Sequence, residues 1–264
     1  MRVVAIVQAR TGSTRLPGKV LQDLAGRTML ARVIRRTARA SLLDEVVVAT
    51  TQSDQDDPVV AECRRLGAAW FRGNEHDVLD RYFATSEALR AELVVRVTSD
   101  CPLIDPALID RVVASFLKER PDYASNFLER TYPRGLDNEA FLFEGLARAW
   151  CEAENPYQRV HVTPYFYENP AIFRLLAVKH DRDLSGHRWT VDTPADMQFA
   201  RAIYDRFGGD DQFAWTDVLQ ILENEPKLSE INRHVHQKEL RDEKLAPDSS
   251  QLGNGKPSNL QPQH

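Results

Sequence analysis

A loop near the start of the chain concentrates the kinds of side chain that bind phosphate. Within residues 8–19 it carries the cations Arg10, Arg15 and Lys19, together with hydroxyl side chains and glycine. Cations form strong charge-assisted hydrogen bonds to phosphate oxygens, and glycine lets backbone amides approach an anion closely. This composition favours a nucleoside triphosphate site over an ordinary solvated loop. The residues expected to contact the nucleotide are Gln8, Ala9, Arg10, Gly12, Ser13, Thr14, Arg15 and Lys19, with Thr98 from a later strand end.

The loop matches neither of two familiar phosphate-binding motifs. A Walker loop has four residues between its glycines and Ser or Thr after its lysine. Here five residues separate Gly12 from Gly18, and Val20 follows Lys19. The pattern G-x-G-x-x-G is absent. Phosphate binding by this chain would therefore use a different kind of loop.

Two aspartates are placed to hold a metal ion. Asp100 and Asp192 each follow a predicted strand and precede a predicted helix start. The carboxyl ends of strands in a parallel sheet line the ligand crevice, and Mg²⁺ prefers oxygen ligands. We expect the two carboxylates to converge on one Mg²⁺; the alternative for Asp100 is a turn or cap. Asp105 and Asp196 are expected to be helix-start residues only.

The segment after the third predicted strand faces the nucleotide base if the sheet is parallel. There, Arg72 and Asn74 could bind the base edge, and Arg81 could reach phosphate or ribose. The alternative, equally supported, is that Asp77 caps the following helix while Asp80 and Arg81 form surface pairs.

The middle of the chain carries polar groups suited to a sugar acid. Arg134 beside Gly135 could form a bidentate contact with a carboxylate. Asn126 and Asp137 could bind hydroxyl groups. The alternative is an arm that contacts a second subunit, and the two roles are compatible.

Several of these strings resemble a known family. Residues 7–10 and 13–19 read Val-Gln-Ala-Arg and Ser-Thr-Arg-Leu-Pro-Gly-Lys, and are similar to the N-terminal signature of sugar-acid cytidylyltransferases. The chain looks most like the branch named for spore coat polysaccharide biosynthesis protein F. Asp100-Cys101-Pro102 and Val191-Asp192-Thr193-Pro194 are similar to the two strings that hold metal in that family.

This resemblance implies a three-layer α/β fold of nucleotide-diphospho-sugar transferase type, Rossmann-like and GT-A-like, with a mostly parallel sheet. It implies CTP as donor, Mg²⁺ as cofactor, a sugar acid as acceptor, a homodimer, and a role in surface polysaccharide biosynthesis. The acceptor's anomeric hydroxyl would attack the α-phosphorus of CTP, and pyrophosphate would leave. The residues expected to act in catalysis are Arg10, Arg15, Lys19 and Asp100.

Two other residue types nearby are not expected to be catalytic. Cys101 has no paired base, so a thiolate nucleophile is not indicated. The family string E-R-E-H-V-T is replaced here by Gln158-Arg159-Val160-His161. His161 is therefore expected to be a packed or hydrogen-bonded helix residue.

Two rival functions are weighed against this interpretation. A glycosyltransferase that uses a finished nucleotide sugar often holds metal through D-x-D, which Asp100-Cys101-Pro102 is not. A non-catalytic nucleotide-binding protein would not need Asp100, Asp192 and Lys19 together.

Strand and helix patterns alternate along the first hundred residues, which indicates a parallel sheet wrapped by helices. The pattern predicts an extended excursion over the sheet at 123–140. The other predicted elements are strands at 3–8, 45–51, 68–71, 93–98, 173–178 and 188–191, and helices at 28–40, 57–67, 77–90, 106–119 and from 194 onward.

Composition bounds the remaining possibilities. The chain has 264 residues, 42% of them hydrophobic, and a formal net charge of −5 without a basic stripe, which argues against nucleic-acid binding. Three scattered cysteines and the lack of a membrane-length apolar run favour a cytoplasmic protein without membrane association. We expect one nucleotidyltransferase domain at 1–236, with an inserted sugar-binding and dimerisation segment at about 123–180, and a disordered tail at 237–264.

Overall fold

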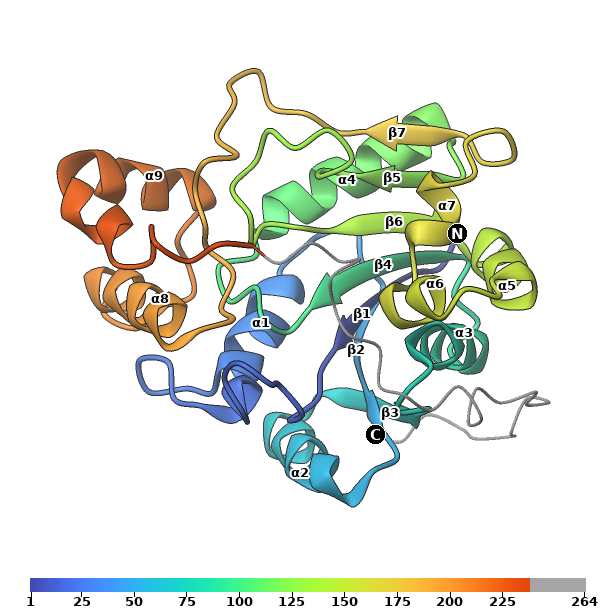
Figure 1. The fold of residues 1–264 in the computed structure, drawn as a ribbon, viewed down its shortest axis with the longest axis horizontal. Coiled ribbons are helices and arrows are strands. Elements are labelled where there is room, and N and C mark those ends of the chain that lie inside the picture. Colours follow the sequence, from blue (N-terminus) through green and yellow to red (C-terminus); the bar gives the residue numbers. More distant parts are fainter. Residues whose placement is uncertain (238–264) are drawn as a thin grey trace.

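The computed structural model describes residues 1–237; the predicted tail lies outside the described residues, apart from Gln237. The described strands form one sheet in the order β3-β2-β1-β4-β6-β5-β7 (Figure 1). The β3-β2-β1-β4 part is parallel, β6 runs antiparallel to β4 and β5, and β7 is parallel to β5. The strands are β1 (Val3–Gln8), β2 (Glu45–Thr51), β3 (Ala69–Gly73), β4 (Leu93–Thr98), β5 (Tyr123–Ser125), β6 (Glu139–Leu142) and β7 (Leu175–Ala177).

The central strands agree with the sequence. The strands predicted at 3–8, 45–51 and 93–98 are confirmed at those bounds. Their β-branched runs are typical of parallel strands buried on both faces, which gives a strong signal. The third and fifth predicted strands are displaced slightly, to β3 and to the shorter β7.

Two predictions for the later part of the chain are wrong. The segment 188–191 is not a strand, because a single β-bridge joins Arg134 and Arg188 there. The excursion predicted at 123–140 instead begins in β5 and ends in β6, both paired within the sheet. These strands have three and four residues, too short to show alternation, so pairing with β4 decides their structure.

Helices cover both faces of the sheet and give three layers. Val3, Ala5 and Val7 of β1 belong to one buried cluster, which includes residues of α1, α2, α4, α8 and α9. Val4 and Ile6 point to the other face and join a cluster with α3, α5 and α7. The predicted α/β class is therefore confirmed. The helices are α1 (Met29–Thr37), α2 (Asp57–Leu66), α3 (Val78–Ala88), α4 (Pro106–Glu119), α5 (Phe143–Glu152), α6 (Pro156–His161), α7 (Pro164–Tyr167), α8 (Pro194–Arg206) and α9 (Trp215–Asn224), with 3₁₀ turns η1 (Lys19–Leu21), η2 (Asp54–Asp56) and η3 (Pro226–Glu230).

Side-chain caps fix most of the predicted helix starts. Asp77 accepts from the backbone N–H of Asp80, and Asp105 accepts from that of Leu108. Thr193 and Asp196 form a reciprocal capping box at the start of α8.

Asp57 does not cap α2, although Asp followed by Pro is typical of a helix start with Asp as the cap. Asp57 is the first residue of α2, after the 3₁₀ turn that ends at Asp56. Its carboxylate instead pairs with Arg72 at 2.6 Å. The helix ends as predicted at Gly67, which has a φ of 64°.

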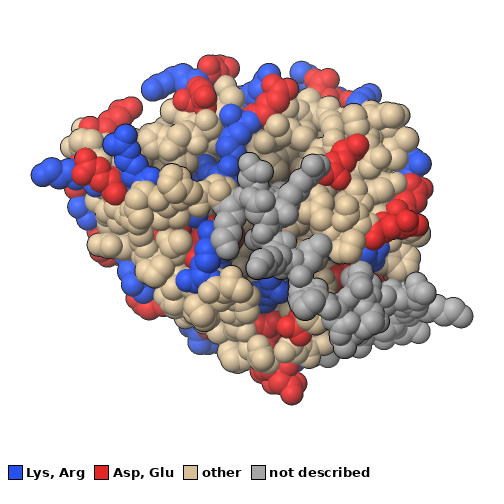
Figure 2. Space-filling model, in the orientation of Figure 1, with Lys and Arg blue, Asp and Glu red and all other residues tan. Residues whose placement is uncertain are grey.

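Two further features of residues 1–237 concern membrane-spanning helices and the distribution of surface charge. No helix within 1–237 is both long enough and apolar enough to cross a bilayer. On the face shown in Figure 2, Lys and Arg side chains are interspersed with Asp and Glu side chains.

Two chain segments cross closely at Gly135. The N–H of Arg134 donates to the carbonyl of His187 at 3.0 Å, and that of Trp189 donates to the carbonyl of Arg134 at 2.6 Å. Gly135 has a φ of +106°, and a Cβ there would lie 2.4 Å from the backbone nitrogen of Thr190. Only glycine allows this approach, which fixes the segment leading to Asp192.

We therefore predict that Gly135→Ala lowers the free energy of unfolding by about 3 kcal/mol, because it combines an unfavourable φ with a backbone clash. Urea denaturation measures this loss. Gly186→Ala is the matched control, since a Cβ at Gly186 meets nothing within 4 Å. Equal stability of the two variants would contradict the assigned role of the crossing.

Candidate active site

The carboxyl ends of β1 and β4 bring two of the predicted site segments together. Gln8 lies opposite Thr98 in the parallel register, so the loops that follow both strands leave the same edge of the sheet. The first loop then turns through Gly18, which has a φ of 66° and begins η1. This turn directs Lys19 inward, toward the loop after β4.

Lys19 joins both predicted metal ligands. Its ammonium lies 3.2 Å from Oδ2 of Asp100 and 2.9 Å from Oδ1 of Asp192. It also donates to the carbonyl of Val191 at 2.7 Å. The two aspartates, 92 positions apart in the chain, therefore converge on one ammonium, and their role as metal ligands stays a prediction.

Two arginines hold the other oxygen of Asp192. Arg15 lies 3.1 Å from Oδ2, and Arg188 lies 2.9 Å from the same atom. Arg188 also pairs with the fully buried Asp196 at 2.9 Å. Asp196, expected only at a helix start, thus also anchors the arginine that holds Asp192.

The resulting cluster is balanced in charge. The carboxylates of Asp100, Asp192 and Asp196 face three cations, which are Lys19, Arg15 and Arg188. Burial lowers the pKa of Lys19, but the two aspartates raise it more, so the net shift is upward. Burial likewise opposes ionisation of Asp100, yet Lys19 and the hydroxyl of Thr98 hold the pKa of Asp100 below its usual value. The contact between Lys19 and Asp100 therefore favours the charged form of both groups.

The cluster opens to solvent on one side. The side chains of Asp100 and Arg15 are 28% and 25% exposed, whereas that of Lys19 is 11% exposed. Arg10, which has no hydrogen bond or ion pair among residues 1–237, is exposed nearby in sequence. A ligand that arrives from solvent would meet Arg10, Arg15 and Asp100 first.

The rest of the first loop is ordered by its own contacts. Thr11 donates from its N–H and its hydroxyl to Asp56, at 2.7 and 2.8 Å. The hydroxyl of Ser13 accepts from the N–H of Leu16, and Thr14 is exposed. Gly12 is exposed with ordinary φ and with nothing within 4 Å of a Cβ. The conformational freedom of glycine is therefore not used at Gly12.

Three other residues predicted to contact the nucleotide form hydrogen bonds within the protein. The N–H of Ala9 donates to the carbonyl of Ala49, and Thr98 donates to Asp100 at 2.6 Å. Gln8 accepts a hydrogen bond from Arg96 at 3.3 Å. The side-chain N–H donors of Gln8 have no hydrogen-bond partner among residues 1–237, so they could bind a ligand.

The predicted base-binding residues largely serve the fold. Arg72 donates to the carbonyls of Thr51 and Ser53 and pairs with Asp57. The side-chain oxygen of Asn74 accepts from two backbone N–H groups, those of residues 76 and 77. The alternative weighed for this segment, a cap by Asp77, is confirmed.

Arg81 is not at the surface, so the predicted surface pair is wrong. It is fully buried and donates to the carbonyl of Asn74, while its Nε and Nη2 have no hydrogen-bond partner among the described residues. Burial lowers the pKa of Arg81 to about 10. In this buried position Arg81 cannot contact a nucleotide directly.

The sugar-binding candidates divide into structural and available groups. Asn126 is 1% exposed and bonds through its amide to the carbonyl of Leu136 and the N–H of Asn138. Asp137 forms two bonds to Arg130, at 2.6 and 2.8 Å. Arg134 is half-buried, and its guanidinium has no hydrogen bond or ion pair among the described residues. Burial and the nearby charge of Arg130 lower the pKa of Arg134, so an anionic partner would stabilise it.

Sequence reasoning missed two groups that shape the site. Arg188 stands four residues before Asp192, but outside a helix this spacing carries no signal. A buried network joins Arg96 to Glu139, and Tyr123 donates to Glu139 at 2.6 Å. It links strands that only the sheet pairing brings together.

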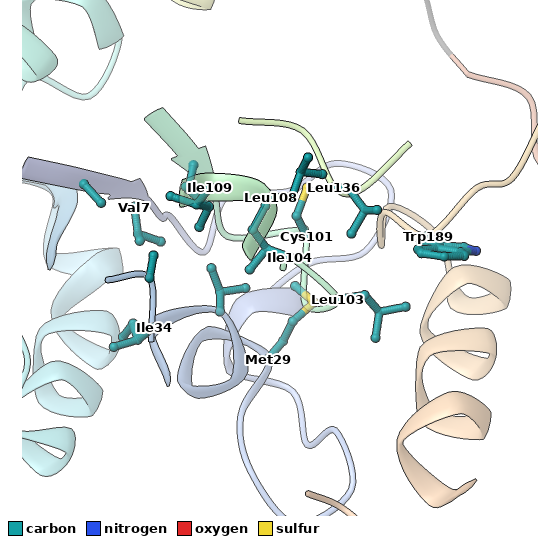
Figure 3. Close-up of a cluster of buried hydrophobic side chains, with 14 of the residues drawn as sticks. Val7, Met29, Ile34, Cys101, Leu103, Ile104, Leu108, Ile109, Leu136 and Trp189 are labelled. Atoms are coloured by element: carbon teal, nitrogen blue, oxygen red, sulfur yellow. The ribbon is translucent and has the colours of Figure 1, made fainter. Parts of the chain in front are cut away.

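His161 occupies a packed helix position, as expected, and Cys101 is also packed. Figure 3 shows Cys101 among buried apolar side chains that include Leu108 and Leu136. Burial raises the pKa of the Cys101 thiol well above its usual value, which disfavours a thiolate. His161 packs against the ring of Tyr157, with ring centroids 5.0 Å apart.

A family model described as cytidylyltransferase matches residues 4–240. Among curated relatives, the uncharacterized protein MJ1063 of Methanocaldococcus jannaschii is 38% identical, over 92% of this chain and 99% of that protein. Spore coat polysaccharide biosynthesis protein SpsF of Bacillus subtilis is 31% identical, over 85% of this chain and 95% of its own.

Solved structures agree with the fold. A cytidylyltransferase from Leptospira borgpetersenii superposes with a TM-score of 0.84 at 31% identity, covering 90% of this chain and 100% of that one. CMP:2-keto-3-deoxy-manno-octonic acid synthetase, solved with CTP, has a TM-score of 0.62 at 21% identity, covering 78% and 100%. Rv0371C of Mycobacterium tuberculosis, solved with manganese, has a TM-score of 0.51 at 17% identity, covering 76% and 99%. The predicted nucleotide-diphospho-sugar transferase fold is thus confirmed.

We predict that Arg188→Met destabilises the protein by about 3 kcal/mol, because it leaves the buried carboxylate of Asp196 without its ion-pair partner. Chemical denaturation measures the loss. Arg206→Met is the control, since Arg206 pairs with Glu225 on the surface, where ion pairs contribute little. If both variants unfold at the same urea concentration, Arg188 does not have the anchoring role assigned to it.

Proposed function

The chain belongs to the cytidylyltransferase family, and we propose that it transfers the cytidylyl group of CTP to the anomeric hydroxyl of a sugar acid. The observation that carries the proposal is the convergence of Asp100 and Asp192 on Lys19, beside the open cations of the first loop. One side of this cluster can receive a polyphosphate, and the other adjoins Arg134.

The donor side is suited to a triphosphate. Arg10 is exposed, and Arg15 is partly exposed beside Asp192, at the edge where β1 ends, the expected ligand edge of a parallel sheet. Their guanidinium groups can neutralise the phosphates and the departing pyrophosphate, Arg10 directly and Arg15 after it exchanges its contact with Asp192. The relative solved with CTP supports a cytidine nucleotide as donor.

Asp100 and Asp192 fit a divalent cation. Their oxygens lie 3.2 and 2.9 Å from one nitrogen, so a single cation between them can contact both. Hard cations such as Mg²⁺ prefer this set of carboxylate oxygens and complete their shell with phosphate and water. When bound, Mg²⁺ would neutralise charge on the phosphates and act as a Lewis acid.

The acceptor side is suited to an acid. Arg134 is a half-buried cation without an ion-pair partner in the described chain, and it precedes the close crossing that fixes its backbone. A carboxylate bound to Arg134 would hold the sugar near Asp100. In the reaction, the hydroxyl oxygen bonds to the α-phosphorus as the bond from the α-phosphorus to the pyrophosphate oxygen breaks, and the hydroxyl proton is released.

The similarity to SpsF supports a role in surface polysaccharide biosynthesis. A homodimer, with residues 123–180 at the contact, and a cytoplasmic location belong to the same proposal. The strands β5, β6 and β7 of that segment lie at one side of the sheet, which leaves β7 as an edge strand. A glycosyltransferase that uses a nucleotide sugar is the competing activity.

We expect the purified protein to release pyrophosphate from CTP, in Mg²⁺, when a suitable 2-keto-3-deoxy sugar acid is present. Release from ATP, GTP and UTP should be at least about tenfold slower. The measurement is a coupled pyrophosphate assay over a panel of sugar acids. Transfer from a finished nucleotide sugar without pyrophosphate release would favour a glycosyltransferase, and inactivity with every nucleotide would favour a binding protein.

The two aspartates should act as one unit. Asp100→Asn and Asp192→Asn should each lower kcat by at least about a hundredfold, because Asn keeps the shape but removes charge that offsets the cation. The double variant should be no slower than the slower single variant, since either change disables the same site. Steady-state kinetics tests this; independent, multiplicative losses would place the two aspartates in separate roles. Circular dichroism checks the fold of each variant.

A further inference from the structure

Lys19 uses all of its hydrogen-bonding capacity within the cluster. A lysine ammonium has three N–H donors. Those of Lys19 are directed to Asp100, Asp192 and the carbonyl of Val191, at 3.2, 2.9 and 2.7 Å. In this position Lys19 has no donor left for a phosphate, so it must release at least one partner before it can bind one.

The same position is the one a divalent cation would need. Lys19 lies between the carboxylate oxygens that would bind the metal, and Asp192 is also paired with Arg15 and Arg188. Three carboxylates already offset three cations in this cluster. A divalent ion added alone would compete with a fixed ammonium and leave an excess of positive charge in a partly buried site, which is costly.

A triphosphate changes that balance. It brings several negative charges, which can compensate the metal and also attract the displaced ammonium. The contact between Lys19 and Asp100 is the longest of the three, and Asp100 is the more exposed carboxylate, so this contact is the one most readily exchanged.

We propose that Lys19 competes with the divalent metal for Asp100 and Asp192. In the nucleotide-free protein its ammonium prevents the metal from binding the two aspartates, and it leaves them when metal and triphosphate bind together. The inference rests on the proposed function for the identity of the triphosphate. Lys19 therefore excludes the metal before it becomes a phosphate ligand.

The test is the affinity for Mn²⁺ in the absence of nucleotide, measured from the electron paramagnetic resonance signal of the free ion. Lys19→Met should bind Mn²⁺ at least about tenfold more tightly than the wild type, which corresponds to the loss of one charged competitor. Lys19→Arg keeps the charge and should stay close to the wild type. Lys118→Met, at a side chain that is 82% exposed, is the control for a general change in charge.

The opposite effect is expected with a nucleotide. For the manganese complex of a non-hydrolysable CTP analogue, calorimetry should show weaker binding to Lys19→Met than to the wild type, because the ammonium can no longer reach the phosphates. This reversal of sign separates competition from a general loss of structure. Arg15→Met, which removes a different cation from Asp192, should give a smaller gain for Mn²⁺ alone and covers the case in which Lys19→Met fails to fold.

Equal Mn²⁺ affinity of the wild type, Lys19→Met and Arg15→Met without nucleotide would overturn the proposal. So would tight binding of Mn²⁺ by the nucleotide-free wild type that CTP does not change. If the proposed function is wrong, the assay for pyrophosphate release will show it. That outcome does not affect the Mn²⁺ titration without nucleotide.

Discussion

A lysine ammonium shared by two carboxylates is the contact on which the geometry of this site depends. It requires β1 and β4 to lie side by side, so that the loops containing Lys19 and Asp100 leave one edge. It also requires the chain to return at Asp192, which the close crossing at Gly135 and the entry to α8 secure. The first loop, the end of β4 and the start of α8 are therefore coupled through the ammonium nitrogen of Lys19. A change in any of these three segments would disturb the ion pairs that Lys19 makes with the others.

A second buried charge network positions the part of the site that contains Arg134. Arg96 of β4 pairs with Glu139 of β6, and Tyr123 of β5 donates to the same carboxylate. These contacts lie where the sheet changes from parallel to antiparallel pairing. Because β6 runs antiparallel to β4, the connection from β5 to β6 reaches the edge where β4 ends. The network thereby places Arg134 on the same side as Asp100.

Several polar residues near the proposed ligand edge serve the structure of this protein. Arg72, Asn74 and Asn126 satisfy backbone groups that would otherwise be left unpaired. Arg10 and Arg134 have no ion-pair partner among the described residues, whereas Arg15 at the same edge is paired with Asp192. A donor and an acceptor that are both anionic would complete the electrostatics of that edge.

The sequence alone determined the central parallel strands and most of the helix starts with Asp or Thr caps, because these depend on local patterning. It also placed Asp100 at the ligand edge, because Asp100 follows a parallel strand. Asp192 follows no strand in the described chain, so packing decided its approach to Lys19 and Asp100. Tertiary structure alone decided β5 and β6, which are too short to carry a periodic signal. It also decided the pairing of Arg188 with Asp192 and Asp196, and the burial of Arg81, because these follow from how distant segments pack. Residue types indicate which chemistry is available, but only the packed chain determines which donors and charges are already satisfied.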